Sequence, residues 1–588
     1  MWSFRIEQIG EKFKRKFYNK FDLFAAIINN QNMFKKNLFR LFFAFFLLNT
    51  WASFISAQPV RPNFNRIRTY DVQHYTIRVS FNRQSKTVFG DTTVQLKPLK
   101  ANFNQIELDA AGLKFASVRL EANNKDIPFR LSNDKIYLTL DKTYAPDDLI
   151  SIRFKYSAKP RKGVYFVDAE TEDGKIIRAA QIWTQGEPEE ARHWFPSYDF
   201  PDDKATSEEF ITVENGEIAI GNGESLEVTE NADGKKTFHF KMPVPHSTYL
   251  TSFVVGTFSK VSDSYKNIPL GYYMYPGSEE VGRRAYGKTK DMMRVYEELT
   301  GVNFPYNKYD QTIVAKFNFG GMENITATTM ADTEIFFNEP NDVEDLVSHE
   351  LAHSWFGDLV TCRNWSELWL NEGFATYMEA AYRERMYGRA DYLRKIREDA
   401  TQYIVEDAVD RNKHGLFNQL ARPDDSLFDT TTYQKGGAVI HTLRETVGAE
   451  NFWKAINIYL DRHKFQNVET ADLQRAMEET SKMDLNLFFK QWVYGGGYPK
   501  FKVSQNYNAQ TKQLDLTIAQ TQEADKLTPE AFILPMEIEI TMAGGVKTQK
   551  IEIKNREEKI SVKVDGEPVR VVLDPNEKIP LKSVKYVL

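Results

Sequence analysis

The hydrophobic pattern of the chain changes from alternating to helical and back to alternating. Within residues 70–253, short runs alternate apolar and polar positions and are separated by Asn, Asp, Gly and Pro, which is typical of half-buried strands. From Gly282 the apolar positions recur at helical spacing, and after the glycine-rich residues 494–499 the alternation returns. The sequence therefore predicts two β regions with a helical region between them.

This pattern predicts a multidomain α+β fold. We expect an N-terminal β-sheet domain at residues 58–255, an α/β domain at 256–494 and a C-terminal β-sandwich at 495–588. One segment, residues 184–205, is dense in acidic residues and Pro, and is expected to be a functional loop. Helices are expected at residues 290–300, 343–357, 366–387, 391–409, 435–447, 450–463 and 470–482, and the later strands at 501–504, 514–519, 536–541, 549–553, 560–564 and 571–573.

The first 57 residues have the pattern of an export signal. Basic residues precede the apolar run 41–48, and the small residues Ser56 and Ala57 form a cleavage site before Gln58. The best fit begins at Met33, so we expect Met33 to be the true start. We therefore expect an exported protein, periplasmic or extracellular, that is not stably inserted in a membrane. An uncleaved membrane anchor is the alternative.

Composition narrows the classes of function. With 588 residues, 42% hydrophobic content, a net charge of −5 and an isoelectric point of about 6.1, the chain predicts a globular protein without a basic surface for nucleic acid. Its one cysteine, Cys362, excludes an intramolecular disulfide.

A metal-binding pattern lies in the helical region, where the sequence H-E-L-A-H begins at His349. On an α-helix, His349 and His353 are separated by roughly 40° around the axis, so both imidazoles can reach one metal ion. Asn341 or Asp342 is expected to cap this helix. Glu350 lies beside the first imidazole, where a carboxylate can take a proton from a water molecule.

Glu372 follows His353 after eighteen residues and lies in the next amphipathic segment. A hairpin of two helices would return its carboxylate to the metal. Two imidazoles and one carboxylate leave an open coordination position, which is typical of catalytic zinc, so we expect one Zn²⁺ per chain. A chance H-E-x-x-H on a surface helix is the alternative, and the position of Glu372 disfavours it.

Residues 311–317 read as a strand that runs into the sequence G-G-M-E-N at residues 320–324. Gly320 and Gly321 lack side chains and let a ligand or another backbone approach closely. We therefore expect an edge strand beside a cleft.

Together, H-E-L-A-H with Glu372, G-G-M-E-N, T-Q-G-E at residues 184–187 and T-T-Y-Q-K-G-G at residues 431–437 resemble the gluzincin aminopeptidases, the family of aminopeptidase N and leukotriene A hydrolase. The resemblance covers residues 70–588, and the four motifs occur in the family's order. It implies a thermolysin-like catalytic domain and removal of single residues from peptides with a free amino end.

The resemblance also implies roles for individual residues. His349, His353 and Glu372 would hold zinc, Glu350 would be the general base, and Tyr433 would stabilise the oxyanion. Glu187 and Glu323 would bind the substrate ammonium group. Substrate contacts are further expected from Gln185, Gly320, Gly321, Met322 and Asn324.

Two departures from the family pattern bear on the expected site. Many relatives carry a helical domain after the β-sandwich, whereas this sequence ends at Leu588, so we expect a more open cleft or one covered by another subunit. Gly321 stands where aminopeptidase N relatives usually have alanine. An epoxide hydrolase of the leukotriene type and a zinc-containing peptide-binding protein without turnover are the competing interpretations.

Overall fold

The computed structural model describes residues 65–409 and 413–587, which belong to one compact unit, Pro62–Leu588. The expected export signal and the start at Met33 lie outside the described residues. Within residues 65–409 and 413–587, we find no helix with the length and apolar character needed to cross a membrane.

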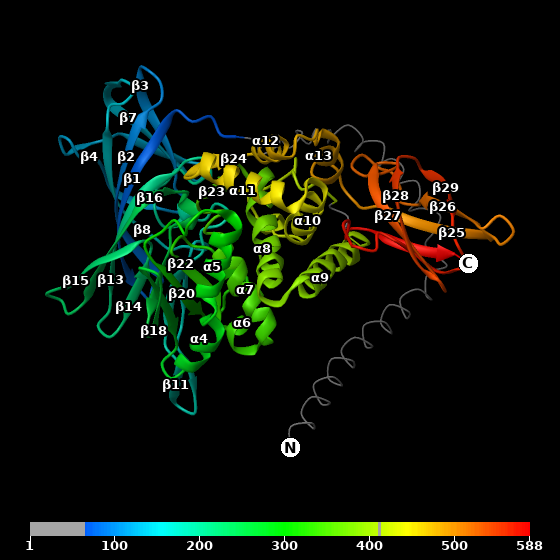
Figure 1. Ribbon diagram of the computed structural model, residues 1–588. Coiled ribbons are helices and arrows are strands. Elements are labelled where there is room, and N and C mark those ends of the chain that lie inside the picture. Colours follow the sequence, from blue (N-terminus) through cyan, green and yellow to red (C-terminus); the bar gives the residue numbers. More distant parts are fainter. Residues whose placement is uncertain (1–64, 410–412, 588) are drawn as a thin grey trace, which may run out of the picture. The chain divides into compact units, whose positions relative to one another are not determined.

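The first part of the described chain is rich in β-strands (Figure 1). Its largest sheet has the order β15-β16-β13-β1-β2-β8-β4-β5. β1 pairs in parallel with β13, whereas the other neighbours pair antiparallel. Alternate residues of β8 are buried, as the sequence alternation predicts. The strands are β1 (Tyr70–Asn82), β2 (Thr87–Pro98), β4 (Lys114–Leu120), β5 (Lys125–Asp126), β8 (Ile150–Ala158), β13 (Ala205–Val213), β15 (Glu224–Glu230) and β16 (Lys236–His246).

Two smaller sheets and a hairpin complete this region. The sheets have the orders β3-β7-β6 and β14-β17-β12-β9, and β10 pairs with β11. β12 is buried along its whole length and leads directly into the T-Q-G-E motif. The bounds are β3 (Phe103–Asp109), β6 (Phe129–Ser132), β7 (Lys135–Tyr144), β9 (Val164–Val167), β10 (Glu170–Glu172), β11 (Lys175–Arg178), β12 (Gln181–Thr184), β14 (Ile218–Gly221) and β17 (Phe253–Gly256).

The segment 184–205 was expected to be a loop outside the core, and the structure places most of it inside. Trp194 and Phe195 are fully buried and pack edge to face against Phe253 and Tyr75, respectively. The acidic residues that disfavoured a core position are neutralised by partners: Glu189, for example, pairs with Arg66 and Arg192. Charge pairing therefore lets this polar sequence fold into the interior.

A five-stranded mixed sheet follows, in the order β18-β19-β20-β22-β21. The strand expected at residues 311–317 is β20, but it lies in the middle of the sheet, so the prediction that it is the edge strand was wrong. The edge is the short strand β21, which carries Gly321 and Met322 and pairs antiparallel with β22. The bounds are β18 (Ser259–Tyr265), β19 (Ile268–Met274), β20 (Tyr309–Val314), β21 (Gly321–Met322) and β22 (Ala327–Ala331).

Helices form the next part of the chain, and α8 packs against α7, α9 and α10 (Figure 1). The small sheet of β23 (Val360–Cys362) and β24 (Gln466–Val468) joins two of the connecting segments. The helices are α4 (Glu279–Tyr286), α5 (Thr289–Thr300), α6 (Asp332–Phe337), α7 (Pro340–Ala352), α8 (Trp369–Tyr387), α9 (Arg389–Asp407), α10 (Gly436–Val447), α11 (Ala449–His463), α12 (Thr470–Ser481) and α13 (Asn486–Trp492).

The helix that carries H-E-L-A-H differs from its expected bounds. It begins with Pro340 at its first turn, where the missing proline N–H costs no hydrogen bond, and neither Asn341 nor Asp342 caps it. It ends at Ala352 rather than at Gly357, because His353 is already the residue that closes the helix. The two histidines are thus one helical turn apart at the very end of α7.

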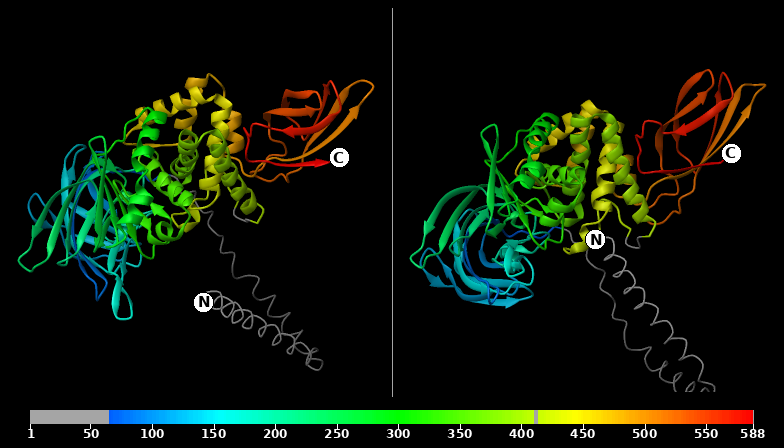
Figure 2. Two further views of the ribbon diagram at one scale, coloured as in Figure 1. Left: turned by 60° about the horizontal axis from the view of Figure 1, so that its bottom comes forward. Right: turned by 90° about the horizontal axis from the view of Figure 1, so that it is seen from below.

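The C-terminal strands, orange to red in Figures 1 and 2, form two sheets, β29-β26-β25-β31 and β28-β27-β30. Both α13 and β31 were missing from the prediction. The fold is therefore mixed α+β, with a β-rich region preceding an α+β region. The strands are β25 (Lys500–Asn508), β26 (Gln513–Gln520), β27 (Leu534–Met542), β28 (Gly545–Ile553), β29 (Glu557–Lys563), β30 (Pro568–Leu573) and β31 (Ser583–Val587).

Candidate active site

A cleft of about 550 Å³ lies between the edge strand β21 and helices α7, α8 and α9. It gathers residues that are up to 249 positions apart in the sequence, from Gln185 to Gln434. Of the predicted site residues it is lined by Gln185, Glu187, Gly320, Gly321, Met322, Glu323, His349, Glu350, His353, Glu372 and Tyr433.

The two histidines and Glu372 converge on one point. His349 Nε2 and His353 Nε2 each lie 3.3 Å from the same atom, Glu372 Oε2. The three donor atoms lie within 4.8 Å of one another and all three side chains are buried. The turn at the end of α7 and the first turn of α8 therefore meet as the spacing of the motif predicts.

The other ring nitrogens are occupied, which directs both Nε2 atoms to the same place. His353 Nδ1 lies 2.9 Å from the carbonyl oxygen of Phe356, so this nitrogen carries the proton. His349 Nδ1 lies 2.8 Å from Glu379 Oε1. Two imidazole lone pairs and one carboxylate oxygen are a donor set that zinc accepts, and partners of this kind fix the orientation of zinc-binding imidazoles.

Glu379 was missed by the sequence analysis. It lies on α8 seven residues after Glu372, hence on the same face of the helix two turns later. Lys395 of α9 approaches the other oxygen of Glu379 at 2.7 Å and also contacts Asp399 at 2.8 Å. The i+7 spacing from Glu372 was the signal that would have identified Glu379.

Glu350 lies at the back of the cleft against β21. Its carboxylate belongs with Glu323 and His353 to a second group of mutually close donor atoms. Burial raises the pKa of Glu350 to about 8, although the nearby charges of His349 and His353 lower it. A carboxylate with a raised pKa is well suited to accept a proton and return it.

A pair of buried carboxylates closes one end of the cleft. Glu187 and Glu323 are each 4% exposed, and one oxygen of each has no hydrogen-bond partner among the described residues. Burial raises the pKa of both, and for Glu187 the charge of Glu323 raises it further. Unpaired buried carboxylates are costly, so this end of the cleft is chemically suited to a cation.

Glu187 projects into the cleft because the backbone around it is fixed. Trp183 Nε1 donates to the carbonyl oxygen of Ala315 at 3.1 Å, which fastens β12 to the segment after β20. Any side chain at Gly186 would overlap the carbonyl group of Tyr249, so only glycine fits there. The neighbouring acidic residues are paired with basic ones: Glu189 with Arg66 and Arg192, and Glu190 with Lys162.

Tyr433 lies on a short π-helix, Thr431–Lys435, with its ring stacked on that of His349 at a centroid distance of 5.8 Å. Asp429 holds the start of this helix, since Thr432 N donates to Asp429 Oδ1 at 2.9 Å. Burial raises the pKa of Tyr433 well above its ordinary value, so its hydroxyl is a hydrogen-bond donor at neutral pH.

Two glycines bring the Tyr433 helix against Glu372. Gly436 Cα lies 3.0 Å from the position that a Cβ on Gly373 would occupy, and a Cβ on Gly436 would lie 2.7 Å from Gly373 Cα. The backbones of α8 and α10 therefore touch directly beside the site. The T-T-Y-Q-K-G-G motif needs its first glycine for this contact.

Asn324 is the one predicted site residue that does not line the cleft. It is fully buried, and its side-chain amide donates to Thr329 Oγ1 of β22 at 3.0 Å. It supports the turn between β21 and β22. Gln185, by contrast, lines the cleft, and its Nε2 atom lies 3.2 Å from Met322 Sδ.

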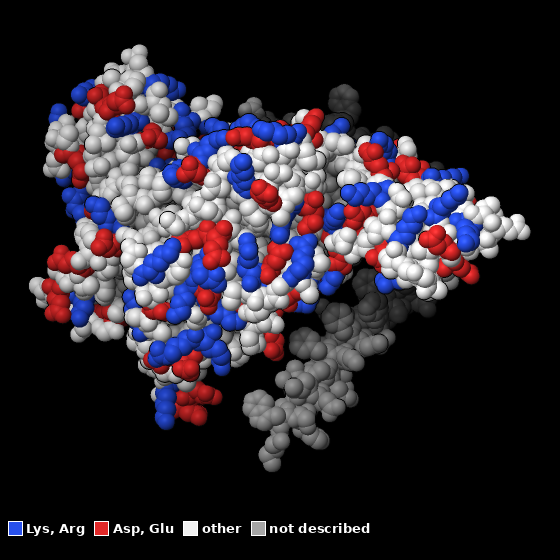
Figure 3. Space-filling view, in the orientation of Figure 1, with Lys and Arg blue, Asp and Glu red and all other residues white. Residues whose placement is uncertain are grey.

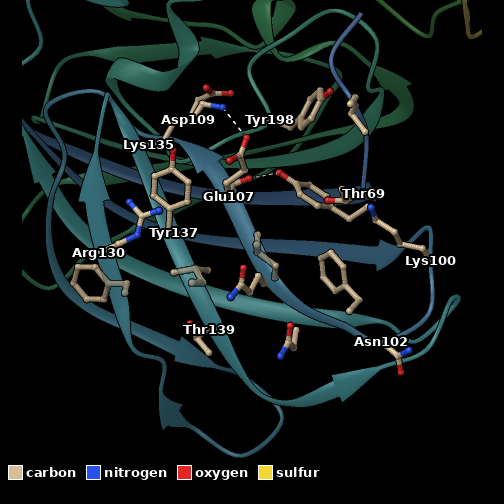
Figure 4. A pocket seen from close by; sticks show the side chains of 18 of the residues that line it. Thr69, Lys100, Asn102, Glu107, Asp109, Arg130, Lys135, Tyr137, Thr139 and Tyr198 are labelled. Atoms are coloured by element: carbon tan, nitrogen blue, oxygen red, sulfur yellow. Dashed lines mark hydrogen bonds and ion pairs between the residues drawn. The ribbon is translucent and has the colours of Figure 1, made fainter.

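A second and larger cavity, of about 1010 Å³, lies among β3, β6 and β7 (Figure 4). Its charged residues are mostly engaged with each other: Lys135 contacts Glu107 at 2.7 Å, and Arg130 lies 3.7 Å over the ring of Tyr137. Among the described residues, all groups of three potential metal donors lie in the smaller cleft. We therefore place the candidate active site in the smaller cleft, although the second cavity is larger.

Comparison with known proteins supports the same assignment. Residues 71–250 match the Peptidase M1 N-terminal domain, and residues 284–492 match the Peptidase family M1 domain. The chain belongs to the M1 peptidase family. The expected resemblance to gluzincin aminopeptidases is thereby confirmed, and the matched M1 peptidase domain contains His349, His353 and Glu372.

Several M1 relatives are aminopeptidases by name. The chain is 27% identical over 484 residues to aminopeptidase 2 of Candida albicans, covering 79% of this chain and 51% of the relative. It is 30% identical over 412 residues to probable aminopeptidase 2 of Sulfurisphaera tokodaii, covering 68% and 51%. For aminopeptidase N of Streptomyces lividans the identity is 35% over 335 residues, covering 54% and 38%. The chain spans about half the length of the first two relatives.

Proposed function

We propose that this protein is a zinc-dependent aminopeptidase that removes the N-terminal residue from peptides. The observation that carries the proposal is the pairing of two features in one cleft. A donor cluster suited to zinc, formed by His349, His353 and Glu372, lies beside two buried carboxylates, Glu187 and Glu323, and one oxygen of each has no hydrogen-bond partner among the described residues. The names of the relatives support the same reaction.

His349, His353 and Glu372 would hold the zinc ion. When bound there, zinc acidifies a water molecule and polarises the scissile carbonyl group. The Nδ1 contacts of both histidines keep Nε2 free for the ion, and Glu379 orients His349.

The residues around the donor cluster carry out the other steps of the proposed reaction. Glu187 and Glu323 bind the substrate ammonium group, which fixes the first peptide bond over the donor cluster. Glu350 takes a proton from the attacking water and transfers it to the leaving amine. The Tyr433 hydroxyl donates a hydrogen bond to the oxygen that gains negative charge. The free edge of β21, at Gly321, aligns the peptide backbone.

The same proposal extends to the architecture and location of the protein. The sheet that ends in β21, together with α7 and α8, supports a thermolysin-like catalytic domain, and the two C-terminal sheets, with alternating burial in β26 and β27, support a β-sandwich. Export of the protein, with peptides as its substrates, remains part of the proposal. On the face in Figure 3, acidic and basic side chains are interspersed, so this face has no continuous basic surface for nucleic acid.

Hydrolysis of unblocked and N-acetylated forms of the same peptides tests this function. We expect single residues to be released from the unblocked peptides only, and a chelator to abolish the release. Equal cleavage of the acetylated forms would contradict the ammonium-binding role of Glu187 and Glu323. Hydrolysis of a lipid epoxide without peptide turnover would favour the leukotriene-type reaction, and zinc binding without any turnover would favour a binding protein.

A further inference from the structure

One wall of the cleft has no role in the reaction proposed above. Helix α9 presents Lys395, Asp399, Gln402 and Glu406 to the cavity. The spacings of four, three and four residues put these side chains on one face of the helix. Asp429 also lines the cleft, and the hydroxyl group of the adjacent Thr430 donates to Glu406.

This wall lies beyond the donor cluster as seen from the ammonium-binding carboxylates. Glu323 approaches the cluster from its His353 side, with 4.0 Å between Glu323 Oε1 and His353 Nδ1. Glu379 lies on the His349 side of the cluster, where it contacts His349 Nδ1, and Lys395 of α9 contacts Glu379. Glu323 and α9 thus lie on different sides of the donor cluster, and the leaving part of a peptide that runs away from Glu323 would pass along α9.

The charge of the wall is negative. Its single cation, Lys395, contacts both Glu379 and Asp399; burial lowers the pKa of Lys395, but these two carboxylates outweigh burial and raise it. Lys395 thus stays charged and is paired with Glu379 and Asp399.

The carboxylates beyond Lys395 retain capacity for a ligand. Asp399 is 4% exposed, and its Oδ2 atom has no hydrogen-bond partner among the described residues. Glu406 is exposed to the cavity and accepts a hydrogen bond from Thr430 Oγ1 at 2.9 Å. His414 lies 2.6 Å from Asp429. Asp399 and Glu406 are therefore the carboxylates that remain open to a cation.

We propose that Asp399 and Glu406 form an acidic subsite that selects peptides with a lysine or arginine side chain on the leaving part of the substrate. This inference rests on the proposed aminopeptidase function and adds its substrate preference. Gln402, one turn from each carboxylate, supplies an amide that hydrogen-bonds the peptide backbone or a guanidinium group.

The test compares three peptides that differ only in the third residue, Leu-Ala-Lys-Ala-Ala, Leu-Ala-Gln-Ala-Ala and Leu-Ala-Glu-Ala-Ala, with leucine p-nitroanilide as the reference substrate. The anilide has no residue on the leaving side, so its rate reports the reaction without the subsite. For the wild-type protein we expect kcat/KM for the lysine peptide to exceed that for the glutamate peptide by about tenfold, the size of one partly screened ion pair together with one avoided repulsion.

Glu406→Gln removes one charge from the wall and keeps the hydrogen-bonding capacity towards Thr430. We expect it to reduce the preference for lysine over glutamate to about threefold or less, and Asp399→Asn to reduce it independently. The matched control is Glu398→Gln, because Glu398 lies on α9, is absent from the cleft lining and pairs with Arg394. It is expected to leave the preference unchanged.

Each outcome has one meaning. Normal hydrolysis of leucine p-nitroanilide with equal rates for the three peptides overturns the subsite and leaves the aminopeptidase function intact. An unchanged lysine preference in both Glu406→Gln and Asp399→Asn assigns the preference elsewhere and likewise overturns the proposal. Absence of hydrolysis of every substrate by the zinc-loaded wild-type protein contradicts the proposed function itself.

Discussion

Gly321 and Glu350 occupy neighbouring space so closely that a side chain on the glycine would overlap the carboxylate of the glutamate. A Cβ built on Gly321 overlaps Glu350 Oε1 and lies 2.7 Å from Glu350 Cγ. The absence of a side chain at Gly321 therefore leaves the space in which the carboxylate of the proposed general base lies.

Gly321→Ala is therefore expected to move Glu350 and to lower kcat by about a hundredfold, the size of a general-base contribution, while the bound zinc is retained. Steady-state hydrolysis of leucine p-nitroanilide and the zinc content of the purified protein measure the two effects. Gly544→Ala is the control, because a Cβ there has no neighbour within 4 Å. Unchanged turnover of Gly321→Ala would mean that Glu350 has room to move without loss.

Glu350→Gln removes the base and keeps the size of the side chain. Turnover is expected to fall by about a hundredfold or more, because an amide cannot accept the proton from water. Zinc should remain bound at one ion per chain, which elemental analysis of the dialysed protein measures. Loss of zinc together with activity would assign Glu350 to the metal.

Tyr433→Phe removes the hydroxyl group and keeps the ring that stacks on His349. We expect kcat to fall by on the order of a hundredfold with little change in KM, since the hydrogen bond is made to charge that develops during the reaction. Kinetics with unblocked peptides measure this effect. An increase of KM alone would make Tyr433 a substrate-binding residue.

Glu379→Gln tests the residue behind His349. Its carboxylate orients the imidazole and is itself held by Lys395, so the substitution is expected to weaken zinc binding by roughly 10- to 100-fold. Competition with a chromophoric chelator reads out the affinity without relying on activity. Zinc affinity equal to that of the wild-type protein would show that His349 is positioned by the helix alone.

Stability is expected to decrease in acid through His441, which is fully buried between the Tyr392 hydroxyl group and the carbonyl oxygen of Glu577. Burial lowers the pKa of His441 to about 4, although the bond to Glu577 raises it. Between pH 6.5 and 4 the unfolded chain binds a proton at this site that the folded protein does not, so stability falls as the pH falls, by about 3 kcal/mol in total.

Urea unfolding of the wild-type protein and of His441→Gln at pH 7 and pH 5 tests this. A glutamine preserves one donor and one acceptor, so the variant should lose less stability on acidification than the wild-type protein. Equal losses would mean that other groups, such as the buried His246, account for the acid sensitivity.

The sequence predicted the parts of the site that depend on local spacing. His349 and His353 are separated by one helical turn, and Glu372 begins the next long helix, so their convergence required only a helix hairpin. Glu379 was missed although its spacing from Glu372 puts it on the same face of α8. The α9 wall was missed because it depends on contacts between helices, which no short motif records. Asn324 is absent from the cleft lining for a related reason: a motif does not show which of its side chains turn towards the neighbouring strand.

For the fold, too, features set by local sequence were predicted, and features set by contacts between distant residues were not. Alternation of apolar and polar residues predicted the two β-rich regions and the later strands β25 to β30, whereas the burial of residues 184–205 could not be predicted from their acidity. Their charges are compensated by Arg66 and Arg192, and Arg66 lies more than a hundred residues away from them in the sequence. β20 was assigned to a sheet edge because the partner that covers it, β22, follows the glycine-rich turn.

The contact between Gly373 and Gly436 has a consequence for protein engineering. The separation of Glu372 from Tyr433 is set by two backbones in direct contact, not by adjustable side chains. A design that transfers this site to another scaffold must therefore transplant the crossing of α8 and α10 as one rigid piece, because copying the side chains alone would leave their spacing undefined.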